Sequence, residues 1–233
     1  MSPHSAPFPR HLAAFVFDAY GTLFDVQSVA STAEALCPGH GAELSRLWRV
    51  KQLEYTWLQS LMATTALPRE DFAAVTAHAL DYAAAALTIT LGASERSQLL
   101  AAYLTLAPYP DTREALLALA PRPRWILSNG TLEMLEPVVR AAELTPLFDG
   151  IISVDAADIY KPAPQVYALA SERLQLPPRD IGFVSSNCWD AIGARAFGFT
   201  TFWINRTGAP VDRHGPAPDF VIASLAQLPG RAG

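Results

Sequence analysis

The sequence predicts an α/β fold, in which a doubly wound parallel sheet carries an inserted domain made only of helices. Near the start and in the second half of the chain, short apolar runs alternate with helical patterns, which is typical of parallel βαβ units. Between residues 26 and 103, helical periodicity replaces the strand-like runs. We therefore expect a core of residues 1–25 and 104–233 and a helical cap of residues 26–103, which closes over the carboxyl ends of the strands.

The core begins with a predicted strand over 13–17, an apolar run that ends at Asp18, and Gly21 supplies the turn that follows. Further strands are predicted over 124–127, 150–154, 181–184, 200–204 and 220–222. Helices of the core are predicted over 111–120, 131–142, 164–174 and 189–197. In the cap, helices are predicted over 43–62 and 71–87, and a shorter one over 94–100.

The long cap helix is predicted to have two faces that make contacts, one with its own bundle and one with a crevice. One is an apolar stripe formed by Leu44, Leu47, Trp48, Tyr55, Leu58 and Met62. Arg49, Leu53 and Trp57 fall on a different face, which suits a helix that packs on its own bundle and also faces a crevice. Arg49 would then be the cation for an anionic substrate or leaving group. The alternative is a solvated arginine whose stem covers apolar surface.

Charge and cysteine content exclude several classes of function. The chain has 233 residues and a formal net charge of −5 without a run of Lys or Arg, which argues against nucleic-acid binding. Cys37 and Cys188 lack metal-type spacing and are interpreted as free thiols in a reducing compartment. The sequence shows no apolar run long enough for a membrane span and no signal peptide, so we expect a soluble cytoplasmic protein.

Polar groups follow four of the predicted strands, where open α/β sheets bind ligands. Asp18 ends the first strand and is a candidate nucleophile, because carboxylates form covalent esters in several enzyme classes. The amides of Ala19 and Tyr20 could face a bound anion, and Thr22 could orient the carboxylate. For Asp18 and Thr22 the alternative is ordinary turn chemistry.

The later strand ends supply the other candidates. Ser128 and Asn129 open a helix, where they could bind an anion or simply cap it. Lys161 precedes a proline and, if buried, would hold carboxylates ionised; otherwise it is a surface lysine. Asp190 could activate water or only complement its helix dipole. Trp189 could line the crevice or pack in the core, and Tyr167 could reach the crevice or pack its own helix.

Together these stretches resemble the haloacid dehalogenase superfamily and, within it, the (S)-specific L-2-haloacid dehalogenases. The similarity covers about residues 15–225, which is nearly the whole chain. It rests on the segments 17–23, 49–57, 128–130, 160–162, 185–190 and 202–206. The resemblance implies a Rossmann-like core with a helical cap, no metal, no cofactor, and often a homodimer.

The resemblance also implies a mechanism. Asp18 attacks C2 of a short 2-haloalkanoate and forms an ester, and water then releases a 2-hydroxy acid of inverted configuration and the halide. The implied catalytic residues are Asp18, Thr22, Arg49, Lys161, Ser185, Asn187 and Asp190. The implied substrate-binding residues are Ala19, Tyr20, Arg49, Leu53, Ser128, Asn129, Tyr167 and Trp189. Within these sets, Arg49 and Asn129 stabilise the halide, and Ser185, Asn187 and Asp190 surround the water.

Two competing functions are considered. One is a metal-dependent phosphatase of the same fold, but such enzymes carry a second aspartate two residues after the nucleophile, where this chain has Tyr20. The other is a protein that only binds a small carboxylate, which gains little from burying two carboxylates. The chain departs from the family pattern at Val50 and Cys188, and both changes are expected to affect substrate range or halide preference.

Overall fold

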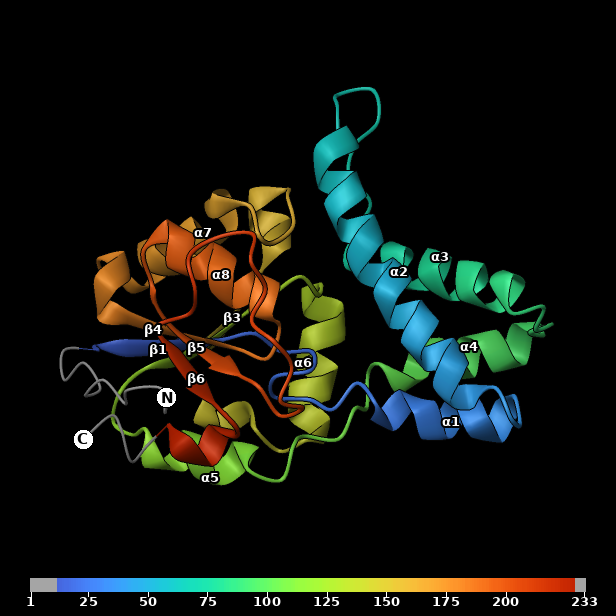
Figure 1. Ribbon diagram of the computed structural model, residues 1–233, viewed down its shortest axis with the longest axis horizontal. Coiled ribbons are helices and arrows are strands. Elements are labelled where there is room, and N and C mark those ends of the chain that lie inside the picture. Colours follow the sequence, from blue (N-terminus) through green and yellow to red (C-terminus); the bar gives the residue numbers. More distant parts are fainter. Residues whose placement is uncertain (1–11, 229–233) are drawn as a thin grey trace.

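The computed structural model describes residues 12–228 and shows a layered α/β core beside a helical cap (Figure 1). Residues 1–11 and 229–233, which the prediction assigns to the core, lie outside the described residues. The six strands are β1 (Ala14–Phe17), β2 (Arg124–Ser128), β3 (Gly150–Ser153), β4 (Ile181–Ser185), β5 (Thr200–Ile204) and β6 (Phe220–Ile222). Each of the predicted strands is confirmed, with ends that differ by one residue at most.

The sheet is parallel throughout and has the order β3-β2-β1-β4-β5-β6. The chain winds outward from β1 in both directions, so the doubly wound prediction is confirmed. Helices α7 (Pro164–Leu174) and α8 (Cys188–Phe197) cover one face, and α5 (Thr112–Ala118) and α6 (Leu132–Ala141) cover the other (Figure 1). In such a sheet the crevice opens at the carboxyl ends of β1 and β4, where the winding direction reverses.

Short 3₁₀ helices complete the core at Thr145–Leu147, Val154–Ala157, Pro178–Asp180 and Leu225–Gln227. The cap consists of α1 (Ser28–Leu36), α2 (Gly41–Met62), α3 (Phe72–Ala86) and α4 (Ala93–Ala102). Helix α1 is absent from the sequence prediction, because it has no side-chain cap and no acidic residue in its first turn. By contrast, α3 has a clear start signal, since the side chain of Asp71 accepts a hydrogen bond from the amide of Ala74.

The buried face of α2 differs from the predicted stripe. Leu44 and Trp48 are buried as expected, but Leu58 is 40% exposed and Met62 is 51% exposed. The buried face continues instead through two polar residues, Gln52 and Thr56. Burial of Gln52 is tolerated because its Nε2 donates to Thr76 Oγ1 of α3 at 2.7 Å. Hydrophobicity by itself therefore predicted the wrong face for the second half of the helix.

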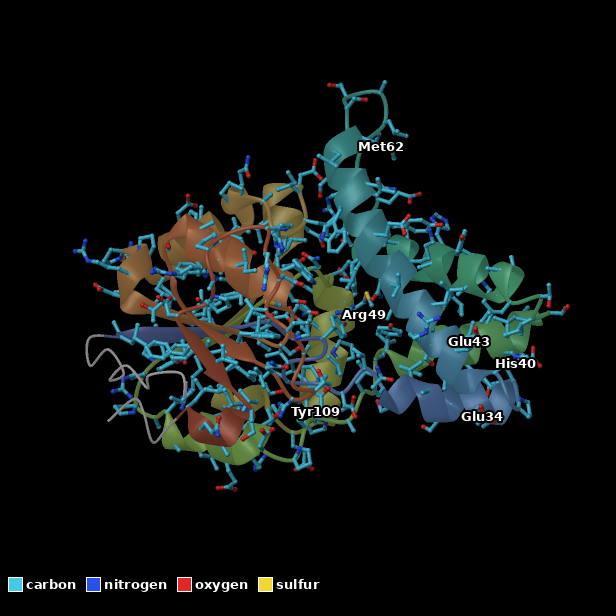
Figure 2. The ribbon with its side chains drawn as sticks, viewed as in Figure 1. Glu34, His40, Glu43, Arg49, Met62 and Tyr109 are labelled. Carbon is cyan, nitrogen blue, oxygen red and sulfur yellow. The ribbon has the colours of Figure 1, made fainter. Side chains whose placement is uncertain are left out.

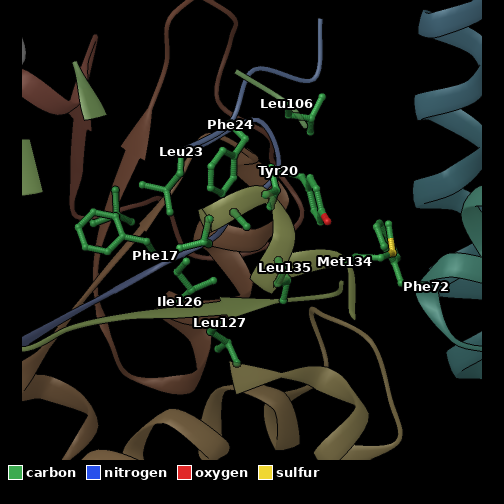
Figure 3. Close-up of a cluster of buried hydrophobic side chains, with 14 of the residues drawn as sticks. Phe17, Tyr20, Leu23, Phe24, Phe72, Leu106, Ile126, Leu127, Met134 and Leu135 are labelled. Atoms are coloured by element: carbon green, nitrogen blue, oxygen red, sulfur yellow. The ribbon is translucent and has the colours of Figure 1, made fainter. Parts of the chain in front are cut away.

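A hydrophobic seam joins core and cap. Figure 3 shows buried side chains of β1, β2 and α6 packed together, with Phe72 of the cap nearby. The ring of Tyr20 stacks on Phe72 at a centroid distance of 5.8 Å and meets Tyr103 edge-on at 6.0 Å. The side chain of Tyr20 thus packs between the two parts of the molecule. Across residues 12–228, no helix combines the length and apolar character that a membrane span needs.

Candidate active site

The site is centred on a buried ammonium group between two carboxylates. Lys161 Nζ lies 3.1 Å from Asp18 Oδ1, at the end of β1, and 3.1 Å from Asp190 Oδ2, in the first turn of α8. Lys161 is 1% exposed, Asp18 is 6% exposed and Asp190 is fully buried. The three side chains come from sequence positions up to 172 residues apart. Asp18 follows β1, Asp190 follows β4, and Lys161 lies in the loop after the 3₁₀ helix that follows β3, so the parallel sheet brings them to the side where its strands end.

The carboxylate of Asp18 is held at both oxygens. Its Oδ1 faces Lys161, and its Oδ2 accepts hydrogen bonds from Thr22 Oγ1 at 2.9 Å and from Asn187 Nδ2 at 3.0 Å. Thr22 in turn accepts a hydrogen bond from the amide of Ser186 at 2.8 Å. These contacts fix the orientation of the carboxylate, which a nucleophile aimed at one carbon atom requires.

Asp190 has a different environment. Burial raises the pKa of its carboxyl group, and Lys161 and the hydroxyl of Tyr167 partly oppose this rise by stabilising the ionised form. Tyr167 donates to Asp190 Oδ1 at 2.8 Å. Burial by itself lowers the pKa of Lys161, but Asp18 and Asp190 outweigh this effect and the pKa is raised. Lys161 therefore stays charged at neutral pH.

The loop after β2 lies against the same group. The amide of Lys161 donates to Asn129 Oδ1 at 3.0 Å, and Ser128 Oγ accepts from the amide of Gly130 at 3.1 Å. Ser128 and Asn129 are both buried. Ser185 is also buried, and its Oγ accepts from the amide of Asn187 at 3.1 Å, which shapes the turn that presents Asn187 to Asp18.

Arg49 is the cationic residue that α2 directs toward the core (Figure 2). Its guanidinium donates to Gln52 Oε1 at 2.6 Å and to the carbonyl of Tyr20 at 3.4 Å. Arg49 is thus placed over the loop that follows Asp18. The hydroxyl of Tyr20 is buried without a hydrogen-bond partner, and burial raises the pKa of this phenol. Ala19, in the same loop, is fully buried.

A cleft of about 400 Å³ leads to the site and is lined by residues that include Arg49, Leu53, Asn187 and Trp189. A second cavity of about 570 Å³ lies beyond Trp57 and is mostly apolar. The rings of Trp57 and Trp189 meet edge-on at 5.4 Å, and Trp189 lines both cavities. The structure therefore brings every predicted site residue to one region, between the strand ends and α2.

Val50 and Cys188, the two departures from the family pattern, lie in different surroundings. Val50 is 49% exposed and points away from the cleft-lining face of α2. Cys188 lines the cleft, and its Sγ accepts a hydrogen bond from the amide of Asp212 at 3.5 Å. Burial raises the pKa of the Cys188 thiol, which keeps it protonated and weakly nucleophilic at neutral pH.

Sequence reasoning assigned no role to Arg206. Its guanidinium pairs with Asp111 at 3.0 Å and stacks on Tyr109 at 3.9 Å, and it borders the cleft. The stack ties the loop after β5 to the segment that leads into α5. Within residues 12–228, no three His, Cys, Asp or Glu side chains are grouped closely enough to hold a metal ion.

The structure thus combines a capped, doubly wound parallel sheet with a buried and oriented aspartate directly after its central strand β1. Comparison with known proteins gives the family: the chain belongs to the haloacid dehalogenase-like hydrolases, whose model matches residues 12–198. The (S)-2-haloacid dehalogenase of Pseudomonas sp. (strain YL) is 46% identical over 217 residues, which cover 92% of each chain.

Solved structures agree with this assignment. The crystal structure of an L-2-haloacid dehalogenase superposes with a TM-score of 0.91 at 45% identity, covering 95% of this chain and 98% of that one. A second structure is that of the L-2-haloacid dehalogenase from Xanthobacter autotrophicus with chloropropionic acid covalently bound. It superposes with a TM-score of 0.86 at 42% identity and covers 94% of this chain and 97% of its own.

Lys161→Met is expected to destabilise the protein by about 3–5 kcal/mol near pH 7, because it leaves two buried carboxylates facing each other. Burial raises the pKa of Asp190, and removal of the ammonium raises it further above its unfolded value. The penalty therefore exists above the unfolded pKa of about 4 and is relieved as pH falls and Asp190 protonates. Urea unfolding of the variant and the wild type between pH 4 and 8 measures this loss of unfolding free energy. Arg195→Met, which breaks a surface pair with Asp219, is the control and should cost less than about 1 kcal/mol. A pH-independent loss for Lys161→Met would contradict the account.

Tyr167→Phe is expected to move the acidic limb of the kcat profile to higher pH. The Tyr167 hydroxyl stabilises ionised Asp190, so its removal raises the pKa of this carboxyl group. The limb moves with that pKa if Asp190 is the base that accepts a proton in the reaction. The measurement is kcat against pH for the variant and the wild type. Tyr82→Phe, on the exposed side of the cap, is the control and should leave the limb in place. A limb that moves to lower pH would show that Asp190 does not have this role.

Proposed function

We propose that the protein hydrolyses short (S)-2-haloalkanoic acids to (R)-2-hydroxyalkanoic acids, through an ester on Asp18, with inversion at C2 and without a metal. The observation that carries the proposal is the Asp18 carboxylate, buried and held by Lys161, Thr22 and Asn187 beneath Arg49. It is supported by the family assignment and by the names of the relatives, and the chloropropionic acid bound covalently in the Xanthobacter structure supports an ester intermediate.

In the first step, a carboxylate oxygen of Asp18 attacks C2 from the side opposite the halogen. The new C–O bond forms as the carbon–halogen bond breaks, and the halide leaves with the electron pair, which accounts for the inversion. Arg49 and Asn129 stabilise the departing anion. Ser128 and the amides of Ala19 and Tyr20 hold the substrate carboxylate, while Leu53 and Trp189 pack on the alkyl part in the cleft.

In the second step, water adds to the side-chain carbonyl carbon of Asp18 and the bond from this carbon to the product oxygen breaks. Asp190 takes one proton of the water and returns it to the product oxygen as that bond breaks, so the product leaves as a 2-hydroxy acid. The second proton of the water passes to solvent as Asp18 returns to its carboxylate form. The raised pKa of Asp190 brings it nearer to the value that suits a general base. Lys161 compensates the charge that moves between the two carboxylates, and Tyr167 keeps Asp190 oriented. Ser185 acts by shaping the turn of Asn187, next to the water.

Metal independence has a chemical reason. A halide leaves as a stable anion and needs neither a proton nor a Lewis acid, unlike the alkoxide that a phosphatase releases. The phenol of Tyr20 stands where the resemblance to phosphatases would place their second aspartate, and it packs on Phe72 and Tyr103. Lys161, rather than a metal ion, is the positive charge between Asp18 and Asp190.

The resemblance also underlies two further proposals, a cytoplasmic location and a homodimer. A dimer would cover apolar surface that a monomer leaves in water. Leu58, Leu61 and Met62, near the end of α2, are the exposed apolar residues that such an interface would bury. We propose no nucleic-acid or membrane partner, and the partners of the site are the 2-haloalkanoate and the halide.

Halide release from (S)-2-chloropropionate tests the function, with EDTA present and with the (R) enantiomer and a phosphate ester assayed in parallel. We expect release from the (S) enantiomer alone, unaffected by EDTA. Asp18→Asn should lower turnover by at least about 10³-fold while the protein stays folded, because an amide is a poor nucleophile. Phosphate release that depends on Mg²⁺ would favour the phosphatase, and binding without turnover would favour a carboxylate-binding protein.

A further inference from the structure

One charged side chain of the cap is buried against the core, outside the site described above. Arg69 lies in the loop between α2 and α3, and its side chain is 4% exposed. Its Nη2 lies 2.7 Å from Asp155 Oδ1 and its Nε 3.3 Å from Asp158 Oδ1, both in the core. Nη1 donates to the carbonyl of Glu70 at 3.1 Å. All three guanidinium nitrogens are therefore engaged, two of them across the cap–core boundary.

The segment that Arg69 contacts leads directly into Lys161. The guanidinium stacks on the ring of Tyr160 at 4.4 Å, and Tyr160 immediately precedes Lys161. Tyr160 has two further bonds to the cap: its hydroxyl donates to the carbonyl of Glu70 at 2.7 Å, and its amide donates to Ser60 Oγ at 3.1 Å. The cap thus holds the backbone and the side chain next to Lys161.

The other end of this segment reaches the loop after β2. Ser153 Oγ lies 2.8 Å from the carbonyl of Gly130 and 3.0 Å from Asp155 Oδ2. Asp155, the partner of Arg69, is therefore two hydrogen-bonded contacts from the loop that carries Ser128 and Asn129. The amide of Lys161 donates to Asn129 Oδ1, so the same loop is also bonded to the other end of the segment. The Arg69 contacts are therefore linked both to Lys161 and to the loop of residues 128–130.

We propose that Arg69 is a positioning residue of the reaction. By holding the cap loop on residues 155–160, it fixes Lys161 and the loop of residues 128–130 in the geometry that Asp18 requires. Arginine suits this position, because a planar guanidinium bonds to two carboxylates and stacks on an aromatic ring at once, whereas an ammonium group is a single point charge. As a statement about catalysis, the inference rests on the proposed function.

Arg69→Gln is the test, with Arg96→Gln as the matched control. Arg96 also makes a two-point ion pair, with Asp81 at 2.6 and 2.8 Å, but this pair joins α3 to α4 within the cap. Misplacing a charged group by about 1 Å costs up to about 100-fold in rate, so we expect Arg69→Gln to lower kcat on (S)-2-chloropropionate by about 10- to 100-fold. Its pH profile should also shift, because the distance from Lys161 to Asp190 affects how far the pKa of Asp190 is raised.

Arg96→Gln should stay within about twofold of wild type and keep the wild-type pH profile, as expected for an exposed pair. Arg69→Lys should restore only part of the loss. If Arg69→Gln is folded and has the wild-type kcat and pH profile, the inference is wrong. It is equally wrong if both glutamine variants lose the same activity, since that result would indicate general destabilisation of the cap.

Hydrogen exchange separates this inference from the proposed function, because it needs no substrate. Backbone amides of residues 153–161 should exchange faster in Arg69→Gln than in wild type, and at the wild-type rate in Arg96→Gln. Unchanged exchange in Arg69→Gln would overturn the positioning role whatever the reaction is. An absence of halide release by the wild type would instead contradict the proposed function, and the exchange rates would still decide whether Arg69 orders the segment before Lys161.

Discussion

The ammonium of Lys161 between Asp18 and Asp190 is the interaction on which the rest of the structure depends. Two carboxylates buried this closely cannot both stay ionised without a compensating cation. Lys161 supplies it at 3.1 Å from each, and the surrounding chain is built to keep it there. The strand order puts the three residues at one edge of the sheet, and Thr22, Asn187 and Tyr167 satisfy the remaining carboxylate oxygens.

The cap completes this arrangement from the other side. Helix α2 brings Arg49 over the loop of Asp18, and the seam of Tyr20, Phe72 and Tyr103 keeps water from that boundary. The loop after α2 then reaches the residues next to Lys161 through Arg69. Arg49 and the segment next to Lys161 are therefore held by contacts that cross the boundary between cap and core. The position of the cap is part of the site rather than a separate cover.

Most of the fold and the site could be predicted from the sequence. The strands were predicted because buried parallel strands are nearly continuous apolar runs, and Asp18, Ser128 and Ser185 because they stand at the ends of such runs. Arg49, Leu53 and Tyr167 lie on helices and were proposed from helical spacing and from the resemblance. Helix α1 escaped prediction because it carries no start signal, and the buried face of α2 was misjudged because Gln52 is buried only through its bond to Thr76. Burial of a polar residue depends on a partner that the local pattern does not contain.

The contacts of Arg69 could not be predicted from local sequence patterns. Arg69 and Asp155 are separated by 86 residues, and neither belongs to a stretch with recognisable chemistry. Only the folded arrangement of the cap loop beside the segment after β3 shows that they meet. Resemblance to a family gave the reacting groups by position, whereas the groups that keep them in place came from the tertiary contacts of this chain.

The most direct test of the central claim is a single-turnover hydrolysis of (S)-2-chloropropionate in ¹⁸O-labelled water, with enzyme in excess. If Asp18 forms the ester, the hydroxyl oxygen of the first product comes from the enzyme and carries no label, while the label enters the Asp18 carboxylate. Mass spectrometry of the product and of the peptide that contains Asp18 reads both positions. A fully labelled hydroxyl group in the first product, with an unlabelled Asp18, would mean that water attacks C2 directly and would contradict the account.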